Sequence, residues 1–202
     1  MREIREEIKA LAADPLEFAA WNLLQALREE LGLDLNDENF DDTPARISRM
    51  YREILSGLKD TDKQVEKILN SAFPCNNDQL VLVKDIEAFS MCPHHFLPVH
   101  YKIHIAYIPS VRVVGLSKLA RLANILAKRP VLQEQFVEDV SSNLMKIEGC
   151  LGAACIAEGA HYCMVMRGVR QGQSRTITSS LKGVFLEDAR ARQELVQLIG
   201  NC

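Results

Sequence analysis

Apolar residues recur at helical spacing through the first part of the chain. The residues that follow this period are Ile4, Ile8, Leu11, Leu16, Ala19, Leu23, Leu24 and Leu27. A polar loop at 32–42 separates them from a second amphipathic segment, in which Thr43 offers a capping hydroxyl ahead of a proline. A further short helix is expected at about 62–72. We therefore predict an N-terminal helical segment over residues 1–78.

The hydrophobic period changes at residue 80, where runs rich in β-branched and aromatic residues begin. The pattern predicts strands at 80–90, 97–108, about 151–166 and 174–185, with helices at about 115–128, 133–147 and 187–199. Residues 79–202 therefore form an α+β domain whose elements follow the order β-β-α-α-β-β.

Composition excludes several classes of protein. The 202 residues are 48% hydrophobic and 25% charged, which is typical of a globular protein. The apolar runs fall short of the roughly 18 to 20 residues that a membrane span needs, and the charged opening does not resemble a secretory signal. We expect a cytoplasmic protein with no membrane association. Its six cysteines then indicate reduced thiols or metal ligands rather than a disulfide framework.

Charge is distributed unevenly along the chain. The net charge of −3 argues against a nucleic-acid partner. However, Asp and Glu are absent between Glu87 and Glu134, a stretch with six basic residues, and between Gly159 and Leu186, a stretch with four. Such segregation suggests a concave site for a small polyanion. Basic side chains that simply face water would give the same pattern.

Two short motifs could supply a metal site. Cys92 and His95 have the C-x-x-H spacing that a tight turn can bring to one ion, and Cys163 could complete a Cys2His set for a catalytic zinc. By strand alternation, His161 would share the face of Cys163. His94 would then remain free for acid–base chemistry beside an open metal position. Spacing alone also allows His94 to be the ligand in place of His95, or an ordinary core cysteine beside a surface turn.

The start of the predicted 115–128 helix has features of an anion site. Ser117 would cap this helix, and Lys118 and Arg121 would lie one turn apart on one face. Further basic candidates are Arg46, Arg49 and Arg167. The carboxylate of Glu134 could accept hydrogen bonds from N1–H and the 2-amino group of guanine, although a first-turn glutamate is also favoured by the helix dipole alone.

Several motifs together closely resemble the GTP cyclohydrolase I family over about residues 17–200. They are SMCPHHFLPV, YIPSVRVVGLSKLARL, VLQEQ, AHYCMVMRGVR and TITSSLKGVF, with DTPARISRMYREILSGL upstream. The resemblance implies a tunnelling fold, with an antiparallel sheet and helices on one face, assembled into a homo-oligomeric ring that is typically a decamer. It also implies hydrolysis of GTP at C8, with formate release and rearrangement to dihydroneopterin triphosphate.

The resemblance implies a role for each candidate residue. It assigns Cys92, His95 and Cys163 to zinc, His94 and His161 to catalysis, Ser117, Lys118, Arg121 and Arg167 to the triphosphate, Gln133 and Glu134 to guanine, and Arg46 and Arg49 to positions near the triphosphate. Sites of the family lie between subunits.

Three positions depart from the family pattern: Pro93 stands where Glu is usual, Tyr101 where Gly is common, and Gln135 where Arg is usual. Pro93 removes a carboxylate and an N–H beside the metal. It therefore keeps open a second hypothesis, a ring protein that binds a purine or pterin nucleotide without turnover or with altered specificity. A third hypothesis is a structural zinc module.

Overall fold

The computed structural model describes residues 14–200, and the chain divides into two compact units, Met1–Leu55 and Ser56–Cys202. The predicted helical turns around Ile4 and Ile8 lie outside the described residues. The sequence-based division at residue 78 differs from this division, since residues 56–78 belong to the second unit.

The first unit is a pair of helices, α2 (Pro15–Leu31) and α3 (Thr43–Ile54), with a short 3-10 turn at Glu38–Phe40 between them. The carboxylate of Asp14 caps α2 by accepting from the N–H of Leu16 at 3.0 Å. The same carboxylate also accepts from Arg52 of α3 at 2.5 Å, and this hydrogen bond holds the pKa of Asp14 well below its usual range.

The predicted capping role of Thr43 is wrong. Thr43 is the first residue of α3 and Asp42 occupies the cap position. An N-cap residue must precede the helical backbone, so a hydroxyl inside the first turn does not take that role.

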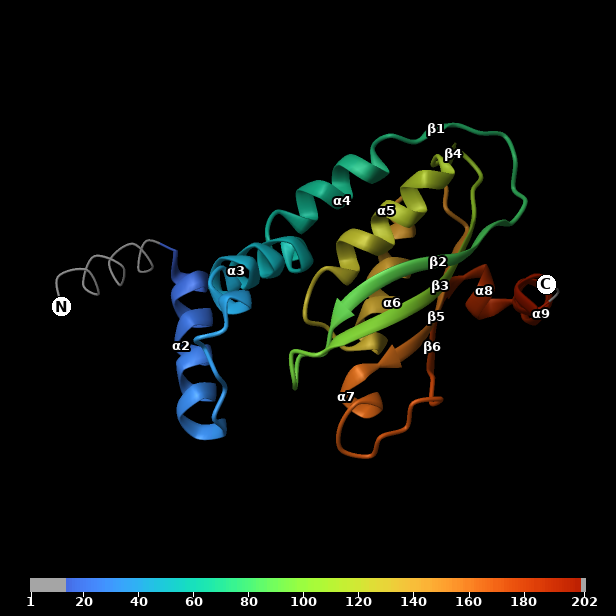
Figure 1. The fold of residues 1–202 in the computed structure, drawn as a ribbon. Helices are drawn as coiled ribbons and strands as arrows, with labels where there is room; N and C mark the ends of the chain where they lie inside the picture. Colours follow the sequence, from blue (N-terminus) through green and yellow to red (C-terminus); the bar gives the residue numbers. More distant parts are fainter. Residues whose placement is uncertain (1–13, 201–202) are drawn as a thin grey trace. The chain divides into compact units, whose positions relative to one another are not determined.

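The second unit is built on a four-stranded antiparallel sheet. Its strands are β2 (Val81–Met91), β3 (Pro98–Ile108), β5 (Gly152–His161) and β6 (Thr176–Gly183), in the spatial order β2-β3-β5-β6. Helices α5 (Leu116–Ala127) and α6 (Gln133–Leu144) come between β3 and β5 in the sequence and cover one face of the sheet (Figure 1). This is the predicted β-β-α-α-β-β order, and the α+β tunnelling-fold expectation is confirmed.

Smaller elements complete the second unit. They are the 3-10 turn Ser56–Leu58, α4 (Thr61–Leu69), the two-stranded ribbon of β1 (Phe73–Pro74) and β4 (Arg112–Val113), α7 (Tyr162–Val165), α8 (Val184–Glu187) and α9 (Ala189–Gly200). Helix α4 packs on α5 through Val65, which is buried in the main core.

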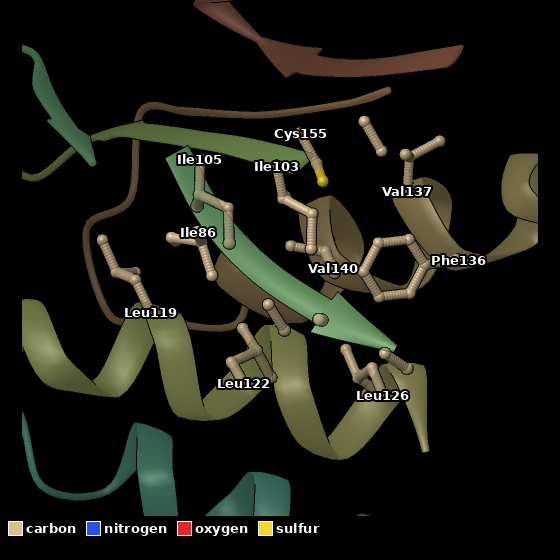
Figure 2. Packing of buried hydrophobic residues seen from close by; sticks show 14 of the residues in the cluster. Ile86, Ile103, Ile105, Leu119, Leu122, Leu126, Phe136, Val137, Val140 and Cys155 are labelled. Carbon is tan, nitrogen blue, oxygen red and sulfur yellow. The ribbon is translucent and has the colours of Figure 1, made fainter. Parts of the chain in front are cut away.

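The main core lies between the sheet and helices α5 and α6. Alternation along β3 points Ile103 and Ile105 toward the helices, where Leu122 of α5 and Phe136 of α6 meet them (Figure 2). These side chains are almost completely buried, so they fix the positions of both helices on the sheet. The first turns of these helices carry several candidate site residues.

A second, smaller core lies on the opposite face of the sheet. Ala106 and Ile108 of β3, which alternate with the residues of the main core, pack against Phe185 of α8 and Leu195 of α9. Helices thus cover one face broadly and the end of the other. Within residues 14–200, the helices all fall short of the length and apolar character required to cross a lipid bilayer.

Candidate active site

The turn between β2 and β3 holds two of the candidate metal ligands. The N–H of Cys92 donates to the carbonyl oxygen of Leu97 at 2.9 Å, and the N–H of Phe96 donates to the carbonyl oxygen of Cys92 at 2.9 Å. Phe96 completes the turn with a left-handed backbone, φ 51°. The turn places Cys92 Sγ 3.8 Å from His95 Nδ1, with the thiol buried and the imidazole exposed.

The third candidate ligand arrives from the end of β5. The predicted strand to residue 166 is wrong, because β5 ends at His161 and Cys163 lies on the helical turn α7. The prediction that His161 and Cys163 share a strand face is therefore wrong. Cys163 reaches the turn because β3 and β5 pair with Val99 opposite His161, which places α7 beside the tip of the β2–β3 hairpin. Figure 1 shows α7 and this hairpin tip at the same end of the sheet.

The three donors form a group that fits a metal ion. One ligand atom each from Cys92, His95 and Cys163 lies within 4.8 Å of the others. Two thiols and one imidazole are a donor set that suits zinc, and three protein ligands leave a fourth position open. Burial, and next the neighbouring Cys92, raise the pKa of the Cys163 thiol, so metal binding must displace its proton.

His94 lies beside this donor group, and His161 comes two residues before Cys163 in the sequence. His94 is exposed in the turn, and its Nδ1 lies 3.9 Å from Cys92 Sγ. His161 is half-buried, and its Nε2 lies 2.8 Å from Oε1 of Gln133. Burial lowers the pKa of His161, and the carboxylate of Glu134 opposes that shift.

Gln133 and Glu134 begin α6 and point to different surroundings. Glu134 is exposed. Gln133 is only 2% exposed, and its Nε2 donates to the carbonyl oxygens of Ala157 and Thr176, both at 2.9 Å. Gln133 was expected to help hold guanine, but both of its amide hydrogens are donated to carbonyl oxygens inside the protein.

Tyr101 fills the core beneath this end of the sheet. It is fully buried and stacks on Phe136 with ring centroids 4.9 Å apart. Burial raises the pKa of its hydroxyl to about 12. Its hydroxyl has no close hydrogen-bond partner among residues 14–200, although the neighbouring Ser90 partly opposes the rise in the pKa.

The basic candidates on α5 line a groove. Lys118 and Arg121, together with Lys67 of α4 and Lys128, contribute to the walls of a hollow of about 440 Å³. The predicted capping role of Ser117 is wrong, because Gly115 takes the cap position and Ser117 is the second residue of the helix. Ser117 is exposed beside this cluster of cations.

The groove and the donor group do not coincide within one chain. The C-terminal end of α5 lies beside the end of β2, where the N–H of Val131 donates to the carbonyl oxygen of Met91 at 3.3 Å. Lys118 lies near the other end of α5, roughly 14 Å away along the helix axis at about 1.5 Å per residue.

The remaining candidate cations, Arg167, Arg46 and Arg49, do not line this groove. Arg167 is exposed just after α7, close enough to Cys163 to favour its thiolate. Arg46 and Arg49 are exposed on α3 in the first unit, and Arg46 lies 3.7 Å from Asp42.

Sequence reasoning missed three contributors to these surroundings. Gly159 lies inside β5, and a Cβ atom there would fall 2.2 Å from Oε1 of Gln133. An isolated glycine within a strand is a known sign of close approach and could have been noticed. Lys67 and Lys128 join the groove through the packing of α4 on α5, which sequence spacing does not encode.

Comparison with known proteins decides the family. The family model described as GTP cyclohydrolase I matches residues 21–200. The chain belongs to the GTP cyclohydrolase I family. Its curated relatives are enzymes named GTP cyclohydrolase 1.

Relatives from several bacteria match most of the chain. GTP cyclohydrolase 1 of Clostridium perfringens (strain 13 / Type A) is 42% identical over 87% of this chain and 94% of its own length. That of Bacillus subtilis (strain 168) is 40% identical over 95% and 98%. Among solved structures, the archaeosine synthase QueF-Like in the apo form covers 52% of this chain and 93% of that chain, with 14% identity and a TM-score of 0.43.

Proposed function

We propose that this member of the GTP cyclohydrolase I family is a zinc enzyme. It adds water to GTP at C8, releases formate and forms 7,8-dihydroneopterin triphosphate, the first step of folate or pterin synthesis. The observation that carries the proposal is the group of Cys92, His95 and Cys163, with donor atoms within 4.8 Å of one another.

These three residues would hold the ion, and their chemistry favours zinc over harder cations. When bound, zinc supplies Lewis-acid activation of water. The buried position of Cys92 and the hydrogen-bonded turn around it keep two of the donors in register without the ion. This pre-organisation supports a catalytic rather than an incidental site.

His161 and His94 would move protons. His161, which is hydrogen-bonded to Gln133, would give a proton to the purine ring, while the exposed His94 would serve the water and the opened ring. The exposed carboxylate of Glu134 would accept from N1–H and the 2-amino group of guanine. A charge-assisted pair of this kind would distinguish guanine from adenine.

The triphosphate would bind the cations of Lys118, Arg121 and Arg167 and the hydroxyl of Ser117. Because Lys118 and the donor group lie at opposite ends of α5, one nucleotide is better served by groups from different copies of the chain. We therefore infer a homo-oligomer with sites completed between subunits, expected to be a decamer. Co-expression of His161→Ala with Lys118→Ala tests this inference, because mixed assemblies regain activity only when a site draws on two chains.

The activity test is incubation of the zinc-loaded protein with GTP, followed by assays for formate and for a fluorescent pterin after oxidation. His94→Ala and His161→Ala should keep their zinc and lose turnover. His100→Ala, a histidine on the opposite face of the sheet, should retain it. Absence of formate at protein levels where a Bacillus subtilis relative gives signal would reject the proposal.

Pro93 favours one alternative, because it places a proline inside the turn that carries Cys92 and His95. A ring protein that binds a nucleotide without turnover predicts that GTP raises the melting temperature while formate stays at background. Comparison of wild type with Pro93→Glu would separate the two, since restored carboxylate chemistry should then raise formate release. A structural zinc site predicts instead that chelation unfolds the protein and that His94→Ala alters only stability.

A further inference from the structure

The side chain of Gln133 occupies a buried slot between α6, β5 and the start of β6. Its Nε2 donates one hydrogen to the carbonyl oxygen of Ala157 and the other to that of Thr176, each at 2.9 Å. A backbone carbonyl can only accept hydrogen bonds. A flipped amide would set its own oxygen against two carbonyl oxygens, so the network allows one orientation of the amide.

That orientation decides what faces His161. The remaining polar atom of the amide is Oε1, which lies 2.8 Å from His161 Nε2. An amide oxygen only accepts, so Nε2 of His161 must carry the hydrogen of this bond. In a neutral imidazole with Nε2 protonated, Nδ1 is the nitrogen with the free lone pair.

The backbone of β5 is shaped for this contact. A Cβ atom at position 159 would lie 2.2 Å from Gln133 Oε1 and 3.1 Å from His161 Nε2. Gly159 is therefore required for the approach of the amide to the ring. A side chain at position 159 would therefore displace the amide or the ring from this contact.

We propose that Gln133 is a positioning residue that holds His161 in its Nε2–H tautomer, so that Nδ1 is the nitrogen that exchanges protons with the substrate. The catalytic meaning of this inference rests on the proposed function of His161. When His161 acts as an acid, the N–H bond at Nδ1 breaks and its proton passes to a ring nitrogen of the purine. The electron pair stays on Nδ1, and the product is the Nε2–H tautomer that Gln133 already binds.

The role differs from base recognition in a measurable way. A residue that binds guanine should change KM for GTP when it is removed. A residue that orients an acid should lower kcat and leave KM nearly unchanged. For Gln133→Leu we expect kcat to fall about tenfold to a hundredfold, the range for losing a partner that orients a functional histidine, with KM altered by less than about twofold.

The direct test is magic-angle-spinning NMR of the zinc-loaded full chain labelled with ¹⁵N-histidine, at alkaline pH, where the two ring-nitrogen shifts identify the tautomer. His161→Ala assigns the signal. Wild type should show Nε2 protonated, and Gln133→Leu should show a mixture or the Nδ1–H form. Gly159→Ala, which closes the slot from the backbone side, should act like Gln133→Leu. Ser141→Ala, at another buried polar position of α6, should leave the tautomer and kcat unchanged.

Three results would overturn the proposal: a wild-type His161 protonated at Nδ1, a Gln133→Leu variant with unchanged tautomer and kcat, or a variant with raised KM and unchanged kcat. The wild-type spectrum decides the tautomer even where a variant fails to fold. It also separates this inference from the proposed function, because a protein that releases no formate still reports which nitrogen of His161 is protonated.

Discussion

Glu138 of α6 offers a sharp test of how the helix that begins with Gln133 is held on the sheet. Its carboxylate accepts from the ammonium of Lys182 and from the hydroxyl of Ser180 at 2.8 Å, both on β6. With its own hydrogen given to Glu138, Ser180 accepts from the hydroxyl of Ser141 of α6 at 2.7 Å. We expect Glu138→Gln, which keeps the shape and removes the charge, to weaken the attachment of α6 to β6.

The magnitude follows from the partners and from their exposure. Hydrogen bonds to a charged group contribute about 1.5–3 kcal/mol and neutral ones about 0.5–1.5. The side chains of Glu138 and Lys182 are 45% and 30% exposed, so solvent screens part of the difference. We expect Glu138→Gln to lower the free energy of unfolding by about 1 kcal/mol at pH 7.

The sign of the pH dependence is fixed by the same contacts. The hydrogen bond from Lys182, and then those from the serines, lower the pKa of Glu138 in the folded protein. A lowered folded-state pKa contributes stability above the ordinary glutamate value, and this stability is lost as pH falls through the folded-state pKa. The difference between wild type and Glu138→Gln should therefore be full at pH 7 and shrink in acid.

Urea unfolding at fixed protein concentration, from pH 7 down to about pH 3.5, measures this difference. Lys182→Met and the double variant complete a cycle, in which the coupling between the two residues should follow the same pH course. A difference that stays constant with pH would refute the reasoning, as would a Glu138→Gln variant more stable than wild type at pH 7.

Three further predictions concern the metal donors and the packing. Cys163→Ser should lose stoichiometric zinc in elemental analysis, whereas Cys155→Ala, which removes a buried thiol outside the donor group, should keep it; full zinc in the first variant would contradict the site. Gly57→Ala should lower the free energy of unfolding by about 2 kcal/mol, because the new Cβ would lie 2.4 Å from the carbonyl oxygen of Ile125, and an unchanged urea midpoint would contradict this. Tyr101→Phe should change that free energy by less than about 1 kcal/mol, since the hydroxyl has no close hydrogen-bond partner within residues 14–200; a larger loss would show that it pairs with the neighbouring Ser90.

The order of elements in the second unit could be predicted because local signals agreed with the final packing. Alternation from Val99 to Tyr107 marks the face of β3 that meets the helices, Pro130 separates α5 from α6, and Gly149 lies between α6 and β5. The end of β5 could not be predicted. The residues after His161 are apolar and suited to a strand, but the chain leaves the sheet there and forms α7.

In the candidate site, too, one part could be predicted from the sequence and another could not. Cys92 and His95 are neighbours along the chain, so their spacing predicts that they meet in a turn. The approach of Cys163 depends on the register of β3 with β5, which is set by tertiary packing. The buried amide of Gln133 shows the limit most clearly, because its three partners come from distant residues and its spacing indicates only the start of a helix.

The placement of the metal donors on two separate segments has a mechanical consequence. Cys92 and His95 cap the hairpin of β2 and β3, and Cys163 follows β5, about seventy residues later. An ion shared by all three would fasten one end of the sheet as a cross-link does. Closing a loop of that length restricts an unfolded chain by on the order of 4 kcal/mol in the loop-entropy picture. The ion proposed for chemistry would thus also stabilise the fold.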